Sequence, residues 1–353
     1  MLTLKRISCL DELIKYKEKW IELEKEHFLF QSWNWNFNWI KSVLKKNKKI
    51  KLDVWIIFEN KEVIAILPFF KEQMFFPKLY IIQFLGHRMS YHNDILLSSK
   101  VNNEKLVAIL EMLKQNIGFF STLLLRHLSA NSPLVDVLDK QNMIHEQCNR
   151  LKLLYNEEDT SSLSRMKNSA RKSFNNRINR LGKKHNYSFE IIKNENLIES
   201  FDRMVGLHKE RFKSKNKETL LTKDNLEFLK KNMLESEDKF EILELTNENG
   251  LMASRLMIKD KDHYFCINGG FNPKYSEFSP MKILLNYTMD RGFNDLNLEF
   301  FDFGPGYEKY KYDWNPDEYK NYYSVISGTS IWSKLQSILF EQFFQYKLNK
   351  AVQ

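Results

Sequence analysis

Apolar and polar positions follow two rhythms along this chain, one with the period of a helix and one typical of strands. In the first half, helical spacing covers 10–25, 35–44 and 104–115, and short apolar runs lie at 54–58, 63–67, 80–85, 94–97 and 122–125. The second half has helical spacing at 197–212, 226–234 and 280–291, and apolar runs at 240–245, 251–258, 263–267 and 297–301. Each half therefore predicts helix, helix, hairpin, strand, helix and strand in that order, which favours two similar α/β domains with mixed sheets.

Length and composition agree with a chain of two domains. The chain has 353 residues, of which 43% are hydrophobic, so it exceeds what one typical core holds. We expect an N-terminal domain over 1–158, a basic interdomain helix over 159–186, a C-terminal domain over 187–328 and a C-terminal amphipathic helix over 329–353.

A strongly basic segment separates the two halves. Eight basic residues and no acidic residue lie between 165 and 184, in a chain of formal net charge +9. Apolar residues at near-fourfold spacing predict a helix with one apolar stripe, made of Met166, Ala170, Phe174, Ile178 and Leu181. The charge favours contact with phosphates or anionic lipid, and a solvated face on a packed helix is the alternative.

The last segment predicts a helix rich in large apolar residues over 331–348. They are Trp332, Leu335, Ile338, Leu339, Phe343 and Phe344. Core packing or dimerisation explains this composition, and a membrane-surface role is the sharper alternative. Because no apolar run approaches the roughly 20 residues that span a bilayer, and the N-terminus lacks a signal-peptide pattern, we expect a soluble cytoplasmic protein. Under the membrane interpretation it lies at the inner face of the membrane.

Sequence motifs of several common enzyme classes are absent. The chain has no phosphate-binding loop, dinucleotide fingerprint, zinc-protease helix or Gly-x-Ser-x-Gly elbow, which argues against a nucleoside triphosphatase, a nicotinamide dehydrogenase and a serine hydrolase. The three cysteines, Cys9, Cys148 and Cys266, have a spacing that predicts neither disulfides nor a zinc site. We expect no metal.

A loop and helix start in the second half have the pattern of an anion site. The loop at 268–279 leads into a helix that begins near Pro280, with Ser279 as a candidate cap. Free backbone N–H groups at a helix N-terminus attract anions, and Lys274 and Lys282 add positive charge. A capped helix without a ligand has the same pattern.

The segment 301–314 combines a strand end, an acid, two glycines and a cluster of tyrosines and lysines. Gly304 and Gly306 permit a sharp turn and the close approach of another group. Candidate acid–base residues elsewhere are His208, on the helix at 197–212, and Asp94, in a polar loop that follows an apolar strand. A tight turn with core aromatics and a structural histidine are the alternatives.

The end of the second half is similar to the CelD-like acetyltransferases of the GNAT superfamily, which are related to the FemAB-type transferases. That family's ending has an Asp-Phe-Gly turn, a Gly-x-Glu-x-Tyr-Lys block and a tryptophan shortly after. The matching positions are Asp302, Phe303, Gly304, Gly306, Glu308, Tyr310, Lys311 and Trp314. The resemblance is strong over 240–325 and looser before 160. It implies tandem GNAT-like domains with mixed, mostly antiparallel sheets flanked by helices.

The resemblance also implies transfer of an acyl group from acetyl-CoA or another acyl-CoA to an amine or hydroxyl. Direct transfer needs a base, a polarised thioester carbonyl and held phosphates. We assign the base to His208 or Asp94, and Tyr310 is a candidate acid or acceptor-binding residue. Predicted acceptor contacts are Arg211, Asp302, Glu308, Lys311 and Tyr91, and predicted cofactor contacts are Lys274, Tyr275, Ser279 and Lys282.

The family is linked to polysaccharide and cell-envelope assembly, so the resemblance implies an amino sugar or related envelope precursor as acceptor. One position departs from the family, because Met281 follows Ser279 and Pro280 where a glycine is usual. An aminoacyl-tRNA-dependent transferase acting on a peptidoglycan precursor is the second hypothesis, with tRNA as the partner of the basic helix. A non-catalytic binding protein on the same fold is the third.

Overall fold

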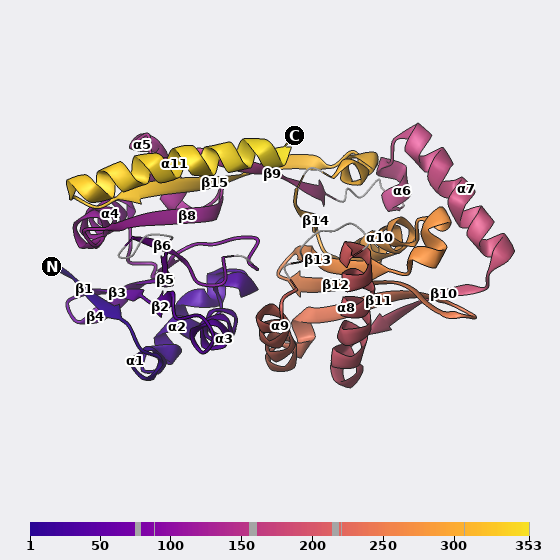
Figure 1. Cartoon of the computed structure of the whole chain (residues 1–353), viewed down its shortest axis with the longest axis horizontal. Coiled ribbons are helices and arrows are strands. Elements are labelled where there is room, and N and C mark those ends of the chain that lie inside the picture. The colour runs from indigo at the N-terminus through magenta and orange to yellow at the C-terminus, as the bar shows by residue number, and fades with distance from the viewer. Residues whose placement is uncertain are drawn as a thin grey trace. The chain divides into compact units, whose positions relative to one another are not determined.

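The protein is described by a computed structural model, which covers residues 1–74, 79–87, 89–154, 161–213, 219, 221–306 and 308–352. Two units divide the chain, the first made of Met1–Asn149 with Lys320–Gln353 and the second of Arg150–Tyr319 (Figure 1). Strand β9 (His145–Leu154) leads into the second unit and β15 (Asp317–Ser327) leads back. The C-terminal segment therefore belongs to the first unit. The expected boundary at 158 and 159 lies outside the described residues.

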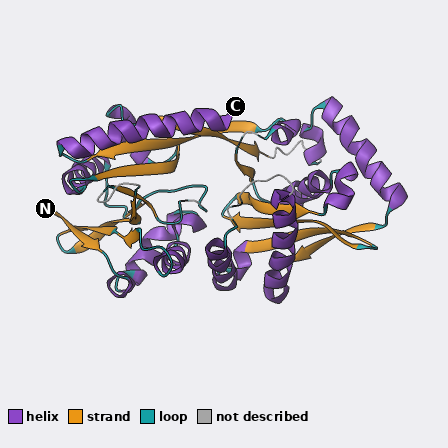
Figure 2. Cartoon of the chain, viewed as in Figure 1, coloured by secondary structure: helices purple, strands orange, loops and turns teal. Residues whose placement is uncertain are grey.

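The first unit has two sheets with helices packed around them (Figure 2). One sheet has the order β1-β3-β4-β7, and the other includes β2-β5-β6-β8-β15. All neighbouring pairs with a described register are antiparallel except β6 and β8. The elements up to β9 are β1 (Leu2–Ile7), α1 (Leu10–Ile14), α2 (Lys17–Leu23), η1 (Glu24–Glu26), η2 (Leu29–Gln31), α3 (Trp33–Leu44), β2 (Ile50–Leu52), β3 (Val54–Glu59), β4 (Glu62–Leu67), β5 (Phe69–Gln73), β6 (Tyr80–Phe84), β7 (Leu96–Leu97), α4 (Asn103–Asn116), β8 (Ser121–Ser129) and α5 (Pro133–Lys140). Helix α11 (Ile331–Val352) follows β15.

The second unit is built on strands in the order β10-β11-β12-β13-β14, with the end of β9 beside β14. Its pairs are antiparallel except β13 and β14. Its elements are α6 (Ser162–Arg165), α7 (Asn168–Lys184), β10 (Tyr187–Ile192), η3 (Asn194–Asn196), α8 (Leu197–Lys213), α9 (Lys223–Glu235), η4 (Glu237–Lys239), β11 (Phe240–Asn247), β12 (Gly250–Asp260), β13 (His263–Phe271), η5 (Pro273–Phe278), α10 (Pro280–Asp290), η6 (Arg291–Asp295), β14 (Phe300–Pro305) and η7 (Lys309–Trp314).

Among the strand pairs with a described register, each unit has one parallel pair, and a helix joins its two strands. In the first unit β6 pairs with β8, and α4 lies between them in the chain. In the second unit β13 pairs with β14, and α10 lies between them. Parallel neighbours need such a crossover, whereas antiparallel neighbours are joined by short turns. The expected α/β class, with mixed and mostly antiparallel sheets repeated in two halves, is confirmed.

Large apolar side chains fill a separate core in each unit. In the first, fully buried Trp55 and Phe69 pack with residues of α4 and β8, such as Leu110 and Leu123. The core of the second unit lies between its sheet, α7 and α10 and includes Met257, Leu284, Phe301 and Trp314, all fully buried. Burial of this kind contributes roughly 1.5–3 kcal/mol for each large side chain, so packing holds the short helices in place.

Several elements differ from the sequence expectation. Strand β14 begins at Phe300, later than expected, because Asn297 has a φ of 51° that interrupts an extended backbone. Strand β14 then continues through Gly304, so Asp302 lies in a strand. The strand expected at 94–97 is limited to Leu96–Leu97, and β1, α5 and β9 have no counterpart among the expected elements.

The described part of the chain contains no helix that is both long enough and apolar enough to cross a bilayer.

The close approach of α8 to β13 generates a stability prediction at Gly270. A Cβ at this position lies 2.5 Å from the backbone nitrogen of His208 and 2.8 Å from the Cβ of Leu207. We expect Gly270→Ala to lower the free energy of unfolding by about 2 kcal/mol, because backbone atoms on both sides must separate. Urea-induced unfolding followed by circular dichroism measures it.

Gly206→Ala is the matched control. Gly206 lies on the exposed side of α8, where a Cβ meets nothing within 4 Å. Alanine favours a helix over glycine by roughly 0.5–1 kcal/mol, so this variant gains stability or stays unchanged. Equal stability of the two variants contradicts a tight contact between α8 and β13.

Candidate active site

The parallel pairing of β13 and β14 ends early. It joins three residue pairs, from His263 with Phe300 to Phe265 with Asp302. Beyond Phe265, strand β13 continues to Phe271 beside β12, and an irregularity of register leaves Ile267 as the extra residue. Bulges of this kind redirect side chains and occur often beside active sites. The two strands therefore separate at the point where β13 carries its bulge.

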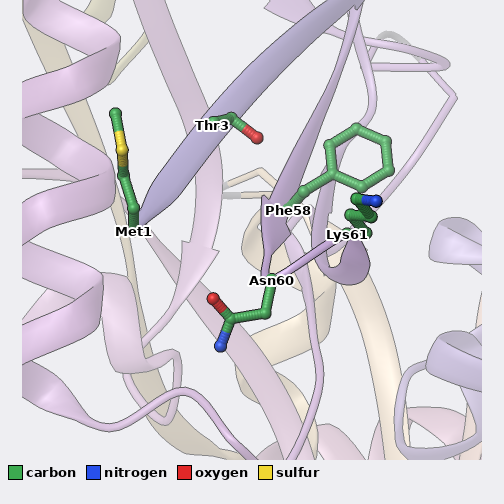
Figure 3. A pocket seen from close by; sticks show the side chains of 5 residues that line it. All are labelled: Met1, Thr3, Phe58, Asn60 and Lys61. Atoms are coloured by element: carbon green, nitrogen blue, oxygen red, sulfur yellow. The ribbon is translucent and has the colours of Figure 1, made fainter.

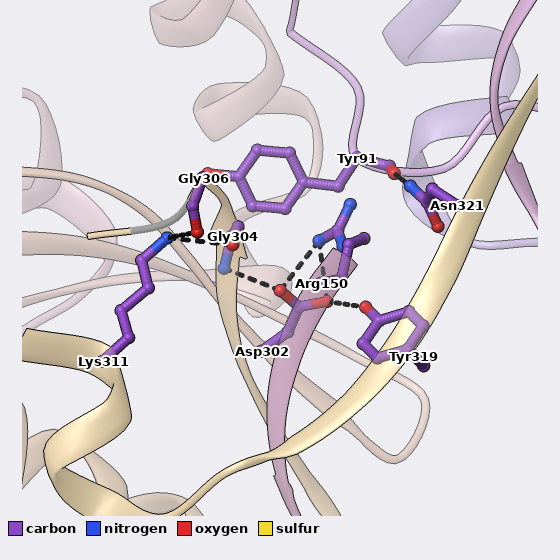
Figure 4. Close-up of polar contacts among 8 residues, drawn as sticks. All are labelled: Tyr91, Arg150, Asp302, Gly304, Gly306, Lys311, Tyr319 and Asn321. Atoms are coloured by element: carbon purple, nitrogen blue, oxygen red, sulfur yellow. Dashed lines mark hydrogen bonds and ion pairs between the residues drawn. The ribbon is translucent and has the colours of Figure 1, made fainter. Parts of the chain in front are cut away.

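A fully buried carboxylate fixes β14 where this separation begins (Figure 4). Both Asp302 oxygens lie 2.7 Å from Nη2 of Arg150 in β9, and both side chains are fully buried. Asp302 also accepts hydrogen bonds from the hydroxyl of Tyr319 and from the backbone N–H of Gly304. These bonds give Asp302 a structural part, and its predicted contact with an acceptor stays a prediction.

The turn after β14 is closed by a lysine. Gly304 and Gly306 have φ angles of 76° and 113°, which side-chain-bearing residues rarely adopt. The buried Nζ of Lys311 donates to their carbonyl oxygens, at 3.1 and 3.3 Å, and forms an ion pair of 2.8 Å with Glu308. Glu308 itself is mostly exposed. Lys311 thus holds the turn, and Glu308 presents a carboxylate at the surface.

Tyr310 has the properties of a proton donor. Burial raises the pKa of Tyr310 to about 12; the charge of Arg255 opposes this rise, and Cys266 adds to it. The residue as a whole is 39% exposed, and desolvation is nevertheless the largest influence on the pKa of its hydroxyl. Arg255 of β12 is buried and donates to Sγ of Cys266 in β13. Tyr310 therefore keeps its proton at neutral pH beside the bulged strand.

Two hydrogen bonds hold His208 in one tautomer. Its Nδ1 lies 3.0 Å from the carbonyl oxygen of Gly269 in β13. Because a carbonyl only accepts, Nδ1 carries the hydrogen, and Nε2 accepts from the Thr219 hydroxyl at 2.8 Å. Burial lowers the pKa of His208, the Gly269 carbonyl raises it and the charge of Arg211 lowers it further. A neutral imidazole with its lone pair on Nε2 has the form that a general base requires.

The start of α10 is shaped by a residue from α7. Ser279 has a φ of 54° and no side-chain cap bond to α10. Its hydroxyl instead accepts from Nη1 of Arg177. Around it, Arg180 and Lys184 of α7 both pair with Glu277, at 2.5 and 3.2 Å. The basic helix therefore lies against the loop that leads into α10, which concentrates positive charge at a helix N-terminus.

The other predicted cofactor contacts differ in their surroundings. Lys282 pairs with Asp313 of η7 at 2.7 Å, and the Tyr275 hydroxyl lies 3.4 Å from the Asn247 side chain. Lys274 is exposed. Arg177 has further N–H donors besides the one given to Ser279, so this corner of the unit fits a phosphate-bearing ligand such as an acyl-CoA.

Two predicted site residues belong to the first unit. Burial raises the pKa of Asp94 to about 7, and hydrogen bonds from Ser132 and from the N–H of Ile95 oppose the rise. The carbonyl oxygen of Tyr91 accepts from Asn321 at 3.2 Å. The remaining predicted residues lie in the second unit, where Tyr310, Lys311 and Glu308 share one turn and His208 and Arg211 share α8.

A pocket in the first unit lies beside the β3–β4 turn (Figure 3). It is lined by Met1, Thr3, Phe58, Asn60 and Lys61. None of the predicted site residues lines it. In the described residues, no three histidine, cysteine or acidic side chains are grouped to hold a metal ion.

Sequence reasoning missed Arg255, Arg177 as the partner of Ser279, and Thr219. Arg255 had a signal, because it is the one charged residue within the apolar run 251–258. Arg177 had none, since its contact with Ser279 joins positions 102 residues apart. Thr219 lies outside the helical spacing at 197–212, so the sequence pattern does not connect it with His208.

Comparisons with known proteins agree with the second unit's architecture. Residues 168–312 match the family described as acetyltransferase (GNAT) domain. The matched segment contains α7, α8, the β11–β13 strands, α10 and the turn with Tyr310. No curated protein matches this chain in sequence.

Solved structures share the fold over nearly the whole chain. The crystal structure of FemX matches with a TM-score of 0.59 and 10% identity, covering 95% of this chain and 99% of FemX. A conserved protein of unknown function from Bacteroides thetaiotaomicron matches with a TM-score of 0.53 and 11% identity, covering 92% of this chain and 99% of that one. At such identities the likeness establishes the fold. The resemblance seen in the sequence is confirmed: the chain has the fold of FemX, and its residues 168–312 match the acetyltransferase (GNAT) domain.

Proposed function

We propose that this protein is an acyl-CoA-dependent acyltransferase that acetylates an amino sugar or a related cell-envelope precursor. The observation that carries the proposal is the neighbourhood of Tyr310. A tyrosine that keeps its proton up to a pKa of about 12 lies beside Arg255 and Cys266, where β13 and β14 of a GNAT domain separate. Acyl transfer from a thioester needs such a donor, because the departing thiolate must take up a proton.

The donor's phosphates belong, in this proposal, between α7 and the start of α10. Arg177, Arg180 and Lys184 supply charge there, and the N-terminal end of the α10 dipole favours an anion. Met281, whose side chain approaches Gly269, occupies the position where the family usually has glycine. Its bulk moves the phosphates toward α7, which supports a larger part for the basic helix.

The chemistry divides between two residues of the second unit. His208 accepts the proton of the acceptor amine at Nε2, directly or through the Thr219 hydroxyl. The amine nitrogen bonds to the acyl carbon while the carbon–sulfur bond breaks. Tyr310 gives its proton to the sulfur, and solvent returns a proton to Tyr310. Glu308, which is exposed beside Tyr310 in the chain, supplies a carboxylate for a hydroxyl- or amine-bearing acceptor.

A second candidate function rests on the FemX fold and the basic helix. FemAB-type transfer takes an aminoacyl group from charged tRNA, and the positive face of α7 suits a phosphate backbone. Affinity for tRNA that falls steeply with salt, without thermal stabilisation by acetyl-CoA, favours this alternative.

The proposal is tested by mixing the purified protein with acetyl-CoA and a panel of amino sugars. Release of free CoA thiol, followed with a thiol-reactive chromophore, measures transfer. Thermal unfolding with and without acetyl-CoA measures donor binding separately. Stabilisation by acetyl-CoA without thiol release for any acceptor supports a binding protein. If acetyl-CoA causes neither stabilisation nor thiol release, the protein does not use this donor.

Tyr310→Phe tests the proton donor. We expect kcat to fall roughly 10- to 100-fold, because the ring remains while the proton is lost, and KM for acetyl-CoA to stay within about twofold. Steady-state thiol release measures both constants. Tyr187→Phe in β10 is the matched control and keeps the parental rate. A Tyr310→Phe protein with parental kcat removes Tyr310 from the mechanism.

The pH dependence of kcat/KM distinguishes the two candidate bases. Because burial lowers the pKa of His208 below its usual 6.5, the rate stays level through neutral pH and falls only in more acidic solution. A base at Asp94 places that fall near pH 7 instead. We expect the first profile, and a loss of roughly 100-fold or more in His208→Gln.

Asp94→Asn is the comparison variant. It also tests how the stability of the parent depends on pH. Between the usual pKa of 3.8 and about 7, folded Asp94 holds a proton that the unfolded chain has lost. Stability of the parent therefore falls as pH rises through this window, and Asp94→Asn lacks that fall. A flat parental profile contradicts burial of the carboxyl group, whereas loss of activity in Asp94→Asn alone assigns the base to the first unit.

Arg177→Gln tests the phosphate subsite. We expect KM for acetyl-CoA to rise about tenfold with little change in kcat, because one charge-assisted contact to the donor is lost. Arg171→Gln is the matched control on the same helix, since Arg171 bonds Asn168 within α7. If the two variants have equal KM values for acetyl-CoA, Arg177 does not contribute to donor binding.

A further inference from the structure

Helix α11 packs one face against the sheet of the first unit. Phe344 is buried beside Tyr323, with ring centroids 4.9 Å apart, and Arg126 lies 4.8 Å above its ring. The Ser333 hydroxyl donates to the carbonyl of Ser121. The positions of this inner face include Ser333, Ser337, Phe340, Phe344 and Leu348. Their spacing of three, four and seven residues marks a single side of the helix.

The opposite face of α11 is also apolar, and it is exposed. At about 100° per residue, its members fall in one arc away from the inner face. The exposed fraction is 74% at Ile331, 56% at Trp332 and 67% at Leu339. We call this arc the outer stripe, and its large apolar members are Ile331, Trp332, Leu335, Ile338, Leu339, Phe343 and Tyr346.

An adjacent loop extends the outer stripe. Phe119 and Phe120 precede β8 and are both exposed, and the ring of Phe120 lies 6.3 Å from that of Trp332. The Ser330 hydroxyl holds the loop by donating to the carbonyl oxygen of Phe119. A helix that is apolar all round is normally covered on all sides. The outer stripe and the two phenylalanines therefore mark a surface that docks on something apolar.

Charge around the outer stripe indicates what it docks on. Lys334 and Lys347 lie on its two shoulders, and Nζ of Lys347 is 4.6 Å from the ring centre of Phe343. The one acidic residue of α11, Glu341, pairs with His145 at 2.7 Å. Lysines that reach outward beside Trp and Tyr are typical of helices at a lipid headgroup layer, whereas the centres of protein interfaces are depleted of lysine.

We propose that the outer stripe, with Phe119 and Phe120, docks this protein on a membrane surface that contains anionic lipids. The apolar side chains enter the headgroup–acyl boundary, and Lys334 and Lys347 contact lipid phosphates. Helix α11 lies along the surface. This inference does not depend on the acyl-transfer chemistry, because it concerns the first unit and its test needs no substrate.

Trp332 provides the readout. It is exposed, whereas the other six tryptophans are each at most 5% exposed. We expect vesicles of phosphatidylcholine with about one-third phosphatidylglycerol to co-sediment the protein. With brominated acyl chains in the same vesicles, Trp332 fluorescence should be quenched. Both effects should weaken with salt and with phosphatidylcholine alone, since the headgroup attraction is screened or absent.

Variants separate the apolar and electrostatic parts. Leu339→Glu should weaken vesicle binding roughly tenfold or more. Replacing Lys334 and Lys347 by glutamine should weaken it about fivefold per lysine, on anionic vesicles only. Leu234→Glu is the matched control, because Leu234 of α9 is 61% exposed in the second unit and lies outside the outer stripe. It should bind as the parent does.

Three outcomes overturn the proposal. The first is a parent protein that stays in the supernatant with anionic vesicles. The second is a Leu339→Glu protein that binds them as well as the parent. The third is that the outer stripe binds a second copy of this chain. Sedimentation velocity then shows a dimer that Leu339→Glu dissociates, and brominated lipid does not quench the fluorescence of Trp332.

Discussion

The buried ion pair of Asp302 and Arg150 is the constraint on which the second unit depends. Both side chains are fully buried, so each charge is tolerable only because the other is 2.7 Å away. The pair joins β14 to β9, and Tyr319 adds a bond from the start of β15. Loss of one member leaves an uncompensated buried charge, which commonly costs 3–5 kcal/mol. Segments far apart in the sequence are thus fixed at one point.

The residues of the proposed site lie just beyond that pair. Asp302 is the last residue of β14 that pairs with β13, and it also receives the N–H of Gly304. The backbone then turns through two glycines whose carbonyl oxygens accept hydrogen bonds from Lys311, and Tyr310, in the same turn, lies near Cys266, the residue before the bulge of β13. On α8, His208 is fixed to the same strand through Gly269. The charge of Arg211, on the same helix as His208, lowers the pKa of both His208 and Tyr310.

The sequence pattern predicted the helices and hairpins whose formation depends on neighbouring residues. Periodicity gave α8, α10 and the β11–β12 hairpin nearly in place, because burial of one helix face or strand face is written in neighbouring residues. The Asp-Phe-Gly block indicated the family. The block did not indicate that both oxygens of Asp302 bond to Arg150, which lies 152 positions away, since no local signal encodes a distant partner. The role of Ser279 was likewise hidden, because its partner comes from another helix.

Ser279 illustrates a conflict between stability and affinity within one residue. Its left-handed backbone is strained for any residue with a side chain, at a cost on the order of 1 kcal/mol, and glycine relieves that strain. Glycine also removes the hydroxyl that orients Arg177. A more stable helix start is thus obtained only by releasing the arginine. Selection for donor affinity would keep a strained serine here, and selection for stability alone would replace it.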